Sequence, residues 1–385
     1  MARFTIIVPV FQTREILRLF LDSLRQTISQ DTDIIFVNDG SGPYVQSVLQ
    51  TFGQQNFPTR CSVRATVLEH RVSQGAAVSI NAALKRMDKA CDYVVFLDSD
   101  TILLDKWQDQ LLPAFAAPDI GAAGGMLLYP QSGGIQCCGI TYCGSSGRHL
   151  YLNALPDMLP MTSPFEVQAT VFAFCCFRLD AIKEIGLLDE RFFNGYEDLD
   201  YQFRLREAGY RIVTVPEIRQ YHWEKSNGAH REFNRKSNLG RFWKKHGQFV
   251  RDDLFSFLQA RLERLPLGKN SYDAFDFCEG RADAMAVRSW LNGYPELDVD
   301  NWTDVSFACR AQHSIWLPEL LDSGMVQSRR PLLFLCDQMV QMLDNQYWWN
   351  LRSGFHTEDL IVDLYGNALF LSQFQHSFWP GKKIR

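Results

Sequence analysis

The stretch YVVFLDSD (93–100) joins five apolar residues to two aspartates that stand one residue apart. A short apolar run bounded by polar residues is typical of a strand that is buried on both faces of a sheet. Similar runs predict strands at 4–10, 33–39 and 65–70, and apolar residues recur at helical spacing over 16–24, between the first two strands. Strands that alternate with helices predict an α/β fold with a mostly parallel central sheet and helices on both faces.

Carboxylates follow two of these strands at the point where each strand ends. Asp98 and Asp100 follow the apolar run, and Asp39 lies in the segment VNDGSG (37–42). Because ligands of such sheets bind beyond the carboxyl ends of the strands, we expect the three side chains to face one crevice. Asp98 and Asp100 point the same way in extended backbone, and a cation such as Mg²⁺ or Mn²⁺ would relieve their repulsion. The alternatives are a solvated turn after the strand and, at Asp39, an Asn-Asp-Gly turn with a purely conformational role.

A predicted helix at 197–209 begins with two carboxylates, Glu197 and Asp198. The helix dipole keeps a carboxylate ionised at this position, and an ionised carboxylate can act as a general base. Acidic residues are also common in the first turn of helices, so a structural role is the alternative. The flanking segments are predicted to be a buried strand at 167–179 and a strand that begins at Arg211 and ends at Pro216.

A polar, basic segment, 221–236, follows that strand. His222 in its neutral form is a good metal ligand. The basic side chains after it could close over a diphosphate as a lid that is mobile without ligand: Lys225, His230, Arg231, Arg235 and Lys236. The alternatives are a structural histidine and a solvated basic loop.

The pattern becomes helical after about residue 250, with helices predicted at 331–343 and 358–364. Six of the nine tryptophans fall in this part, which indicates a separate aromatic-rich module. A chain of 385 residues exceeds a usual single core. We therefore predict an α/β domain at 1–250 and a mainly helical domain at 251–385 that recognises an acceptor or forms an oligomer.

The composition argues against several classes of protein. A net charge of -5 does not suit a general nucleic-acid-binding protein, which needs a basic surface. No window approaches the roughly 18 apolar residues of a membrane span, and the N-terminal segment lacks the pattern of a signal peptide. The ten cysteines include no CxxC pair that would indicate zinc, so we expect a soluble, cytoplasmic protein in a reducing compartment.

The succession of motifs over about residues 3–250 resembles the family 2 nucleotide-sugar glycosyltransferases of the GT-A fold, including bacterial rhamnosyl- and polysaccharide-type enzymes. The resemblance rests on TIIVPVF, VNDGSG, DSD, GGMLLYP, NLGRFWKKHG and, most specifically, the block from Ile185 to His222. It implies a metal-dependent, inverting enzyme that uses a nucleoside-diphosphate sugar such as a UDP-sugar. The acceptor would be a hydroxyl group of a glycan, a lipid-linked glycan or a protein, and the cofactor Mn²⁺ or Mg²⁺.

The resemblance also implies roles for individual residues. Asp198, with Glu197 beside it, would be the catalytic base. The implied metal ligands are Asp98, Asp100 and His222. The implied nucleotide contacts, with Asp39 reading the base, are Pro9, Val10, Asp39, Ser73, Gly75 and Asp98. The implied lid over the diphosphate contains Lys225, His230 and Arg231.

Two positions depart from the family pattern. Ser73 replaces an asparagine, and Val171–Phe174 replaces a Thr-Gly-Ala-Cys sequence near the sugar, so Phe172 is expected to narrow the sugar pocket.

Two other functions stay open. One is a non-catalytic module of the same fold that binds a nucleotide or a glycan. The other is a sugar-nucleotide pyrophosphorylase, although the glycine-rich loop that such an enzyme needs after the first strand is missing from VPVFQTRE.

Overall fold

The computed structural model divides the chain into two compact units. The first unit comprises 1–131, 137–140 and 161–250, and the second comprises 132–136, 141–160 and 251–385. The structure describes residues 2–12, 15–104, 106–159, 161, 163–223, 228–278, 281–305, 328–340, 342, 352 and 356–373, with the side chains of 228–233 excepted.

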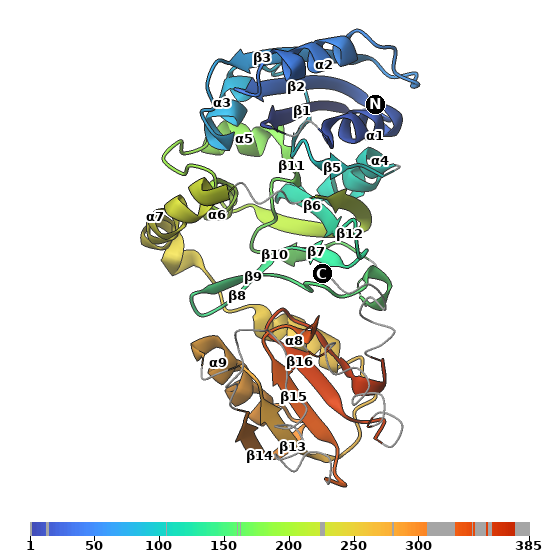
Figure 1. Ribbon diagram of the computed structural model, residues 1–385, viewed down its shortest axis with the longest axis vertical. Helices are drawn as coiled ribbons and strands as arrows, with labels where there is room; N and C mark the ends of the chain where they lie inside the picture. The colour runs from blue at the N-terminus through green and yellow to red at the C-terminus, as the bar shows by residue number, and fades with distance from the viewer. Residues whose placement is uncertain are drawn as a thin grey trace. The chain divides into compact units, whose positions relative to one another are not determined.

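The N-terminal half of the first unit confirms the predicted alternation of strands and helices (Figure 1). Four parallel strands lie in the order β3-β2-β1-β4. These strands and the helices between them are β1 Arg3–Val10, α1 Leu17–Thr27, β2 Asp31–Asp39, α2 Pro43–Gly53, β3 Val63–His70, α3 Ala76–Arg86 and β4 Tyr93–Leu97. The strand order reverses between β1 and β4, and ligands of such sheets bind at the carboxyl ends beside this point.

The sheet continues beyond β4 through β11, β6, β12 and β10, and it has ten strands together with the short β5 and β7. β11 is antiparallel to both β4 and β6, whereas β12 is parallel to β6. The elements of this half are β5 Thr101–Ile102, α4 Trp107–Leu111, β6 Ile120–Leu128, β7 Ile135–Cys137, β10 Phe165–Val167, β11 Phe174–Arg178, α5 Leu179–Ile185, α6 Glu197–Glu207, β12 Arg211–His222 and α7 Gly228–His246. The predicted α/β class is therefore confirmed, and the four parallel strands β3-β2-β1-β4 form one half of the sheet, with β3 at its edge.

The predicted single strand at 167–179 is wrong, since the chain leaves the sheet between β10 and β11. The side chain of Gln202 takes the place of a neighbouring strand at Thr170. Its Nε2 donates to the Thr170 carbonyl at 2.6 Å, and its Oε1 accepts from the Thr170 N–H at 2.8 Å. A side chain from α6 thus satisfies backbone groups that the sequence pattern assigned to a ladder.

The predicted end of a strand at Pro216 is also wrong. β12 continues to His222 through a register shift between Val215 and Arg219. Proline lacks an N–H group, and a sheet tolerates it at such an irregularity. The continuation matters for the site, because it carries His222 along the sheet.

The second unit contains a five-stranded sheet in the order β14-β13-β15-β16-β17 (Figure 1). Its first four strands are parallel, and β17 is antiparallel to β16. The main elements of the unit are α8 Leu254–Leu262, β13 Ser271–Asp276, α9 Ala282–Asn292, β14 Asp298–Asp304, β15 Leu332–Cys336, β16 Leu360–Asp363 and β17 Ala368–Phe370. β8 Ile140–Cys143 and β9 Ser146–His149 form a separate two-stranded sheet. If the strands of the five-stranded sheet are numbered 1 to 5 along the chain from β13 to β17, their order in the sheet is 2-1-3-4-5. This order is found in doubly wound α/β domains.

Two predicted C-terminal helices are wrong. The segments 331–343 and 358–364 contain β15 and β16 instead, so the described part of the second unit is only partly helical. Every residue of β15 is fully buried. A strand covered on both faces produces a continuous apolar run, and periodicity does not distinguish such a run from a buried helix.

Among the described helices, none combines the length and the apolar character that crossing a bilayer requires.

The nine cysteines within the described residues are all free thiols. Eight of these nine are buried, where a thiol packs as a small apolar side chain.

Phe172 packs in the core of the first unit. Its ring packs nearly edge-on against Phe96, Phe177 and Tyr201, with centroid distances of 5.0, 5.8 and 6.2 Å. Only 8% of the residue is exposed. That Phe172 also narrows the sugar pocket stays a prediction. Its ring stabilises the contact between β4, β11 and α6.

Replacement of Phe172 should accordingly affect stability. Phe172→Ala is expected to lower the free energy of unfolding by about 3–5 kcal/mol, because it leaves a cavity among packed rings. Urea denaturation followed by tryptophan fluorescence measures this change. Leu19→Ala is the control, since Leu19 on α1 is 54% exposed and its loss should change the free energy by less than about 0.5 kcal/mol. Equal effects of the two substitutions would contradict the packing of Phe172.

Candidate active site

The turn that contains Asp98 and Asp100 lies at the carboxyl end of β4. The Asp98 N–H donates to the Ala173 carbonyl at 3.3 Å, and the Thr101 N–H donates to the Asp98 carbonyl at 3.2 Å. The Thr101 hydroxyl donates to the same Ala173 carbonyl at 3.1 Å. These bonds hold the two carboxylates at the tip of the strand, beside the point where the strand order reverses.

Strand pairing brings His222 to this turn. β5 begins at Thr101 and pairs antiparallel with the end of β12, so that His222 lies opposite Thr101. The next residue, Trp223, donates its backbone N–H to the Asp100 carbonyl at 3.1 Å. An imidazole from a late strand is thereby placed beside two carboxylates from an early one.

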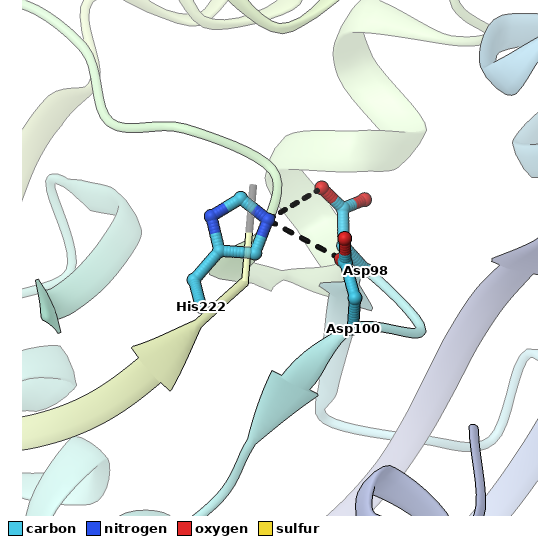
Figure 2. A group of neighbouring side chains, drawn as sticks. All are labelled: Asp98, Asp100 and His222. Atoms are coloured by element: carbon cyan, nitrogen blue, oxygen red, sulfur yellow. Dashed lines mark ion pairs between the residues drawn. The ribbon is translucent and has the colours of Figure 1, made fainter. Parts of the chain in front are cut away.

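The three side chains point toward one another (Figure 2). His222 Nε2 lies 3.3 Å from Asp100 Oδ1 and 3.7 Å from Asp98 Oδ2, and the three ligand atoms lie within 4.8 Å of one another. In an octahedral Mg²⁺ site with ligands at about 2.0–2.1 Å, adjacent ligand atoms are about 3 Å apart and opposite ones about 4 Å. The spacing and the donor set therefore fit a divalent cation. Asp98, whose side chain is 49% exposed, is the most open of the three.

Glu197 and Asp198 occupy the first turn of α6. They follow a turn, 194–196, whose three residues all have positive φ. Glu197 Oε2 accepts a hydrogen bond from the Gly195 N–H at 2.5 Å, and Asp198 Oδ1 accepts one from the Leu199 N–H at 2.8 Å. Such backbone conformations persist only where the surroundings fix them, and they are common at functional sites.

The carboxylate pair and the strand-end cluster share one electrostatic environment. Burial, followed by the negative charge of Asp198 and, to a smaller degree, that of Asp98, raises the pKa of Glu197 to about 7, although backbone hydrogen bonds oppose the rise. Since Asp98 belongs to the cluster with His222, its effect on Glu197 indicates that the two groups lie near each other. A cation bound at the cluster would oppose this rise in the pKa.

Asp39 at the end of β2 is 3% exposed, and donors from one loop occupy both of its carboxylate oxygens. Oδ1 lies 2.9 Å from His70 Nδ1 and accepts from the Gln74 N–H at 2.8 Å. Oδ2 accepts from the Ser73 hydroxyl at 2.7 Å and from the Gly75 N–H at 3.0 Å. Burial opposes ionisation, but these hydrogen bonds outweigh it and lower the pKa of Asp39. Asp39 therefore holds this loop, and a nucleobase N–H can bind it only by displacing a donor.

The two residues at the end of β1 differ in exposure. Pro9 is partly exposed, whereas Val10 is fully buried. The Val10 carbonyl accepts a hydrogen bond from the Ser41 hydroxyl at 3.0 Å. The side chain of Val10 thus belongs to the core, and Pro9 is the one of this pair that can contact a ligand.

Comparison with known proteins relates the first part of the chain to a known family. Residues 5–136 match the model of glycosyl transferase family 2, so this segment is similar to the domains of that family. A pre-mycofactocin glycosyltransferase of Mycobacterium tuberculosis is 29% identical over 219 residues, which are 55% of this chain and 41% of that protein. The O-antigen biosynthesis protein RfbC of Myxococcus xanthus is 26% identical over 235 residues, 58% of this chain and 17% of that protein. The chain therefore spans less than half the length of either relative.

A solved structure supports the fold. The crystal structure of GalNAc-T7 with UDP, GalNAc and Mn²⁺ aligns with a TM-score of 0.50, over 70% of this chain and 52% of that chain. The sequence identity is 15%, so the likeness concerns the fold alone. The GT-A fold expected from the sequence is confirmed.

Two asparagines hold the chain before α6. Asn238 of α7 donates to the carbonyls of Phe193 and Gly195 at 3.1 and 2.9 Å. Asn81 of α3 donates to the Leu188 carbonyl at 3.0 Å and accepts from the Leu188 N–H at 2.9 Å. The sequence did not reveal either role. Asn238 lies in the motif NLGRFWKKHG, which supported the family resemblance but did not indicate that Asn238 binds the carbonyls of Phe193 and Gly195.

Asp200 lies in a buried charge network that joins α6 to α7. Its Oδ1 lies 2.5 Å from Lys245 Nζ and 2.9 Å from His246 Nε2, and its Oδ2 lies 3.2 Å from Arg204 Nε. The other ring nitrogen of His246 lies 2.5 Å from Glu207 Oε1. Burial would raise the pKa of Asp200, but these partners lower it. Removal of one partner from such a network leaves a buried charge uncompensated, so Asp200 has a structural role.

The basic segment 225–236 is not a loop throughout, since α7 begins at Gly228. Lys225 lies outside the described residues, and so do the side chains of His230 and Arg231. Their role as a lid over the diphosphate stays a prediction.

The contacts of Asp39 predict a pH-dependent contribution to stability. Asp39→Asn should lower the free energy of unfolding by about 1–3 kcal/mol near neutral pH, because an amide cannot accept from all four donors. The folded-state pKa lies below the ordinary value of 3.8. The stabilisation is therefore complete above that value and is lost as the pH falls through the lower folded-state pKa.

Urea denaturation at several pH values between about 7 and 3 measures this effect. The difference between wild type and Asp39→Asn should shrink toward the acid end. Asp22→Asn, at an exposed position of α1, should match wild type throughout. A difference that stays constant over this range would contradict the role of the ionised carboxylate.

Proposed function

We propose that this chain transfers a sugar from a nucleoside-diphosphate sugar to a hydroxyl group of an acceptor, with inversion at the anomeric carbon. The observation that carries the proposal is the cluster of Asp98, Asp100 and His222 near the Glu197–Asp198 pair. A module that only binds a nucleotide or a glycan has no need of a carboxylate that can remove a proton. The pair therefore favours an enzyme over a binding module.

Mn²⁺ or Mg²⁺ is the proposed cofactor, held by Asp98, Asp100 and His222. When bound, such an ion neutralises the charge that develops on the departing diphosphate. Carboxylate oxygens suit both ions, and the imidazole nitrogen is a better ligand for a transition metal than for Mg²⁺. The presence of UDP and Mn²⁺ in the GalNAc-T7 structure supports a UDP-type donor and Mn²⁺.

The nucleotide is proposed to lie against Pro9 and the loop of Ser73 and Gly75, with Asp98 on the ribose side. Gly75 has a φ of +88°, and a Cβ atom there would lie 2.9 Å from the ring of Phe193. This position therefore requires glycine. Asp39 sets the shape of the loop, and an N–H of the base would reach its carboxylate in place of one of the present donors. Lys225, His230 and Arg231 are proposed to cover the diphosphate.

Asp198 is proposed to take the proton of the acceptor hydroxyl as the hydroxyl attacks the anomeric carbon. In a single-step inversion the base and the leaving group lie on opposite faces of the sugar. Glu197 is the second candidate, because a carboxylate with a pKa of about 7 is a stronger base and is half ionised near neutral pH. A glycan, a lipid-linked glycan and a protein are all suitable acceptors by chemistry.

Removal of divalent cations should abolish turnover. Excess EDTA is expected to stop the release of nucleoside diphosphate from a panel of nucleotide sugars, and added Mn²⁺ should restore it. Asp100→Asn removes one carboxylate from the cluster and should weaken Mn²⁺ binding at least about tenfold in a titration with UDP present. The exposed Asp22→Asn should leave both measurements unchanged. Undiminished turnover in EDTA would contradict the metal site.

Replacement of the base should separate binding from transfer. Asp198→Asn keeps the size of the side chain, so the donor should bind normally while the transfer rate falls by about 10²–10⁴-fold. If Glu197 is the base instead, Glu197→Gln causes the larger loss, and the rate rises with pH through the pKa of Glu197, which the bound cation lowers from the metal-free value of about 7.

The control for this experiment is Asp180→Asn. Asp180 is a carboxylate on α5 whose side chain is 76% exposed, and its replacement should leave transfer intact. Asp200→Asn is unsuitable as a control, because it disrupts the network with Lys245 and His246 and should lower stability. Near-normal transfer by both Asp198→Asn and Glu197→Gln would exclude this pair as the base.

A further inference from the structure

A hollow between α8 and α9 offers a ligand site in the second unit. It has a volume of about 340 Å³ and is lined by the end of each helix and by the turn that follows α9. The lining side chains that carry chemistry are Gln259, Glu263, Trp290, Tyr294 and Glu296. The volume is at the lower end of the range of about 300–1,000 Å³ that is typical of small-ligand sites.

An aromatic wall forms one side of the hollow. The rings of Trp290 and Tyr294 lie 5.2 Å apart, and Phe255 stacks on Trp290 at 5.7 Å with an interplanar angle of 29°. Trp290 also packs against the core of the unit, and Tyr294 is 7% exposed. The wall is therefore held in place before a ligand arrives, which reduces the entropy cost of binding.

Hydrogen-bond acceptors form the remainder of the lining. Glu263 and Glu296 are exposed carboxylates, and the Gln259 amide donates to Glu263 at 2.7 Å. Burial, the charges of Glu296 and Glu263, and a hydrogen bond to Glu296 raise the pKa of Tyr294, so its hydroxyl stays protonated and donates to the Glu296 carboxylate. These groups can accept several hydrogen bonds from a ligand that carries hydroxyl groups.

The lining also excludes some ligands. None of its eight residues is basic, so a phosphate or a nucleotide would meet uncompensated negative charge. Two aromatic rings together with carboxylate and amide acceptors match the two kinds of surface of a sugar ring, its C–H face and its hydroxyl groups.

We propose that this hollow binds a neutral carbohydrate, the acceptor glycan of the transfer reaction. The inference rests on the proposed function, which requires an acceptor with hydroxyl groups, and it selects a glycan among the possible acceptors. The residues of the hollow all belong to the second unit, whereas the metal ligands and the carboxylate pair belong to the first.

The test uses the full chain and a panel of immobilised neutral oligosaccharides built from glucose, galactose, mannose, rhamnose and N-acetylglucosamine. At least one member should bind, and Trp290→Ala and Glu296→Gln should each weaken that binding at least about tenfold. Met285→Ala is the matched control, since Met285 lies on α9, is 59% exposed and does not line the hollow. Glu296→Gln is a surface change, so it keeps the test informative if Trp290→Ala affects folding.

Hydrolysis of nucleotide sugars without a glycan, in which water takes the sugar and nucleoside diphosphate is released, separates this inference from the proposed function. The release should be unchanged in the variants of the hollow, because it depends on residues of the first unit. No release by wild type from any donor would overturn the proposed function. Intact release without binding of any oligosaccharide, or with equal binding by the variants, would overturn the carbohydrate site alone. Binding of tetramethylammonium in preference to every oligosaccharide would assign the aromatic and acidic lining to a cation and also overturn it.

Discussion

The antiparallel pairing of β5 with β12 is the contact on which the candidate active site depends. It consists of two residue pairs, Thr101 with His222 and Ile102 with Tyr221. Two carboxylates at the tip of one strand repel each other, and a turn such as Asp98–Asp100 is stable only in water or beside a compensating group. The pairing supplies a fixed imidazole beside them. A loose, solvated turn thereby becomes a three-sided site for a cation.

The carboxylate pair of α6 depends on a different support. Its preceding turn, 194–196, has positive φ at every residue, so the surrounding structure must hold it. α7 does so in two ways. Asn238 donates to two carbonyls of the segment 193–195, and Lys245 and His246 bind Asp200 one turn along α6. Buried charges are expensive to desolvate. Here they keep α6 and α7 together, so that the carboxylates keep their position.

The two units differ in the chemical groups that they present. The first unit collects charged groups at strand ends, which suit a cation and the diphosphate of a donor. The second unit has a compact α/β core, and the hollow beside that core is lined by Trp290, Tyr294 and two carboxylates, with no basic residue among its eight lining residues. A sugar nucleotide carries a charged diphosphate, whereas a neutral glycan carries no charge. The proposed donor and acceptor sites would differ in charge in the same way.

The sequence alone determined the elements whose signals are local. Apolar runs and helical spacing predicted the strands and helices of the first hundred residues, and chain order placed Asp39, Asp98 and Asp100 at strand ends. Only the tertiary structure decided which of these groups meet, and with what. Gln202 interrupts a predicted strand, Phe172 packs into the core, and β15 is a strand although its apolar run also fits a helix. The hydrogen-bonding positions of the Asp39 carboxylate are occupied by groups from the end of β3 and from the loop that follows it. Each of these outcomes depends on a partner distant in the sequence, and neither periodicity nor composition contains the direction in which a side chain points.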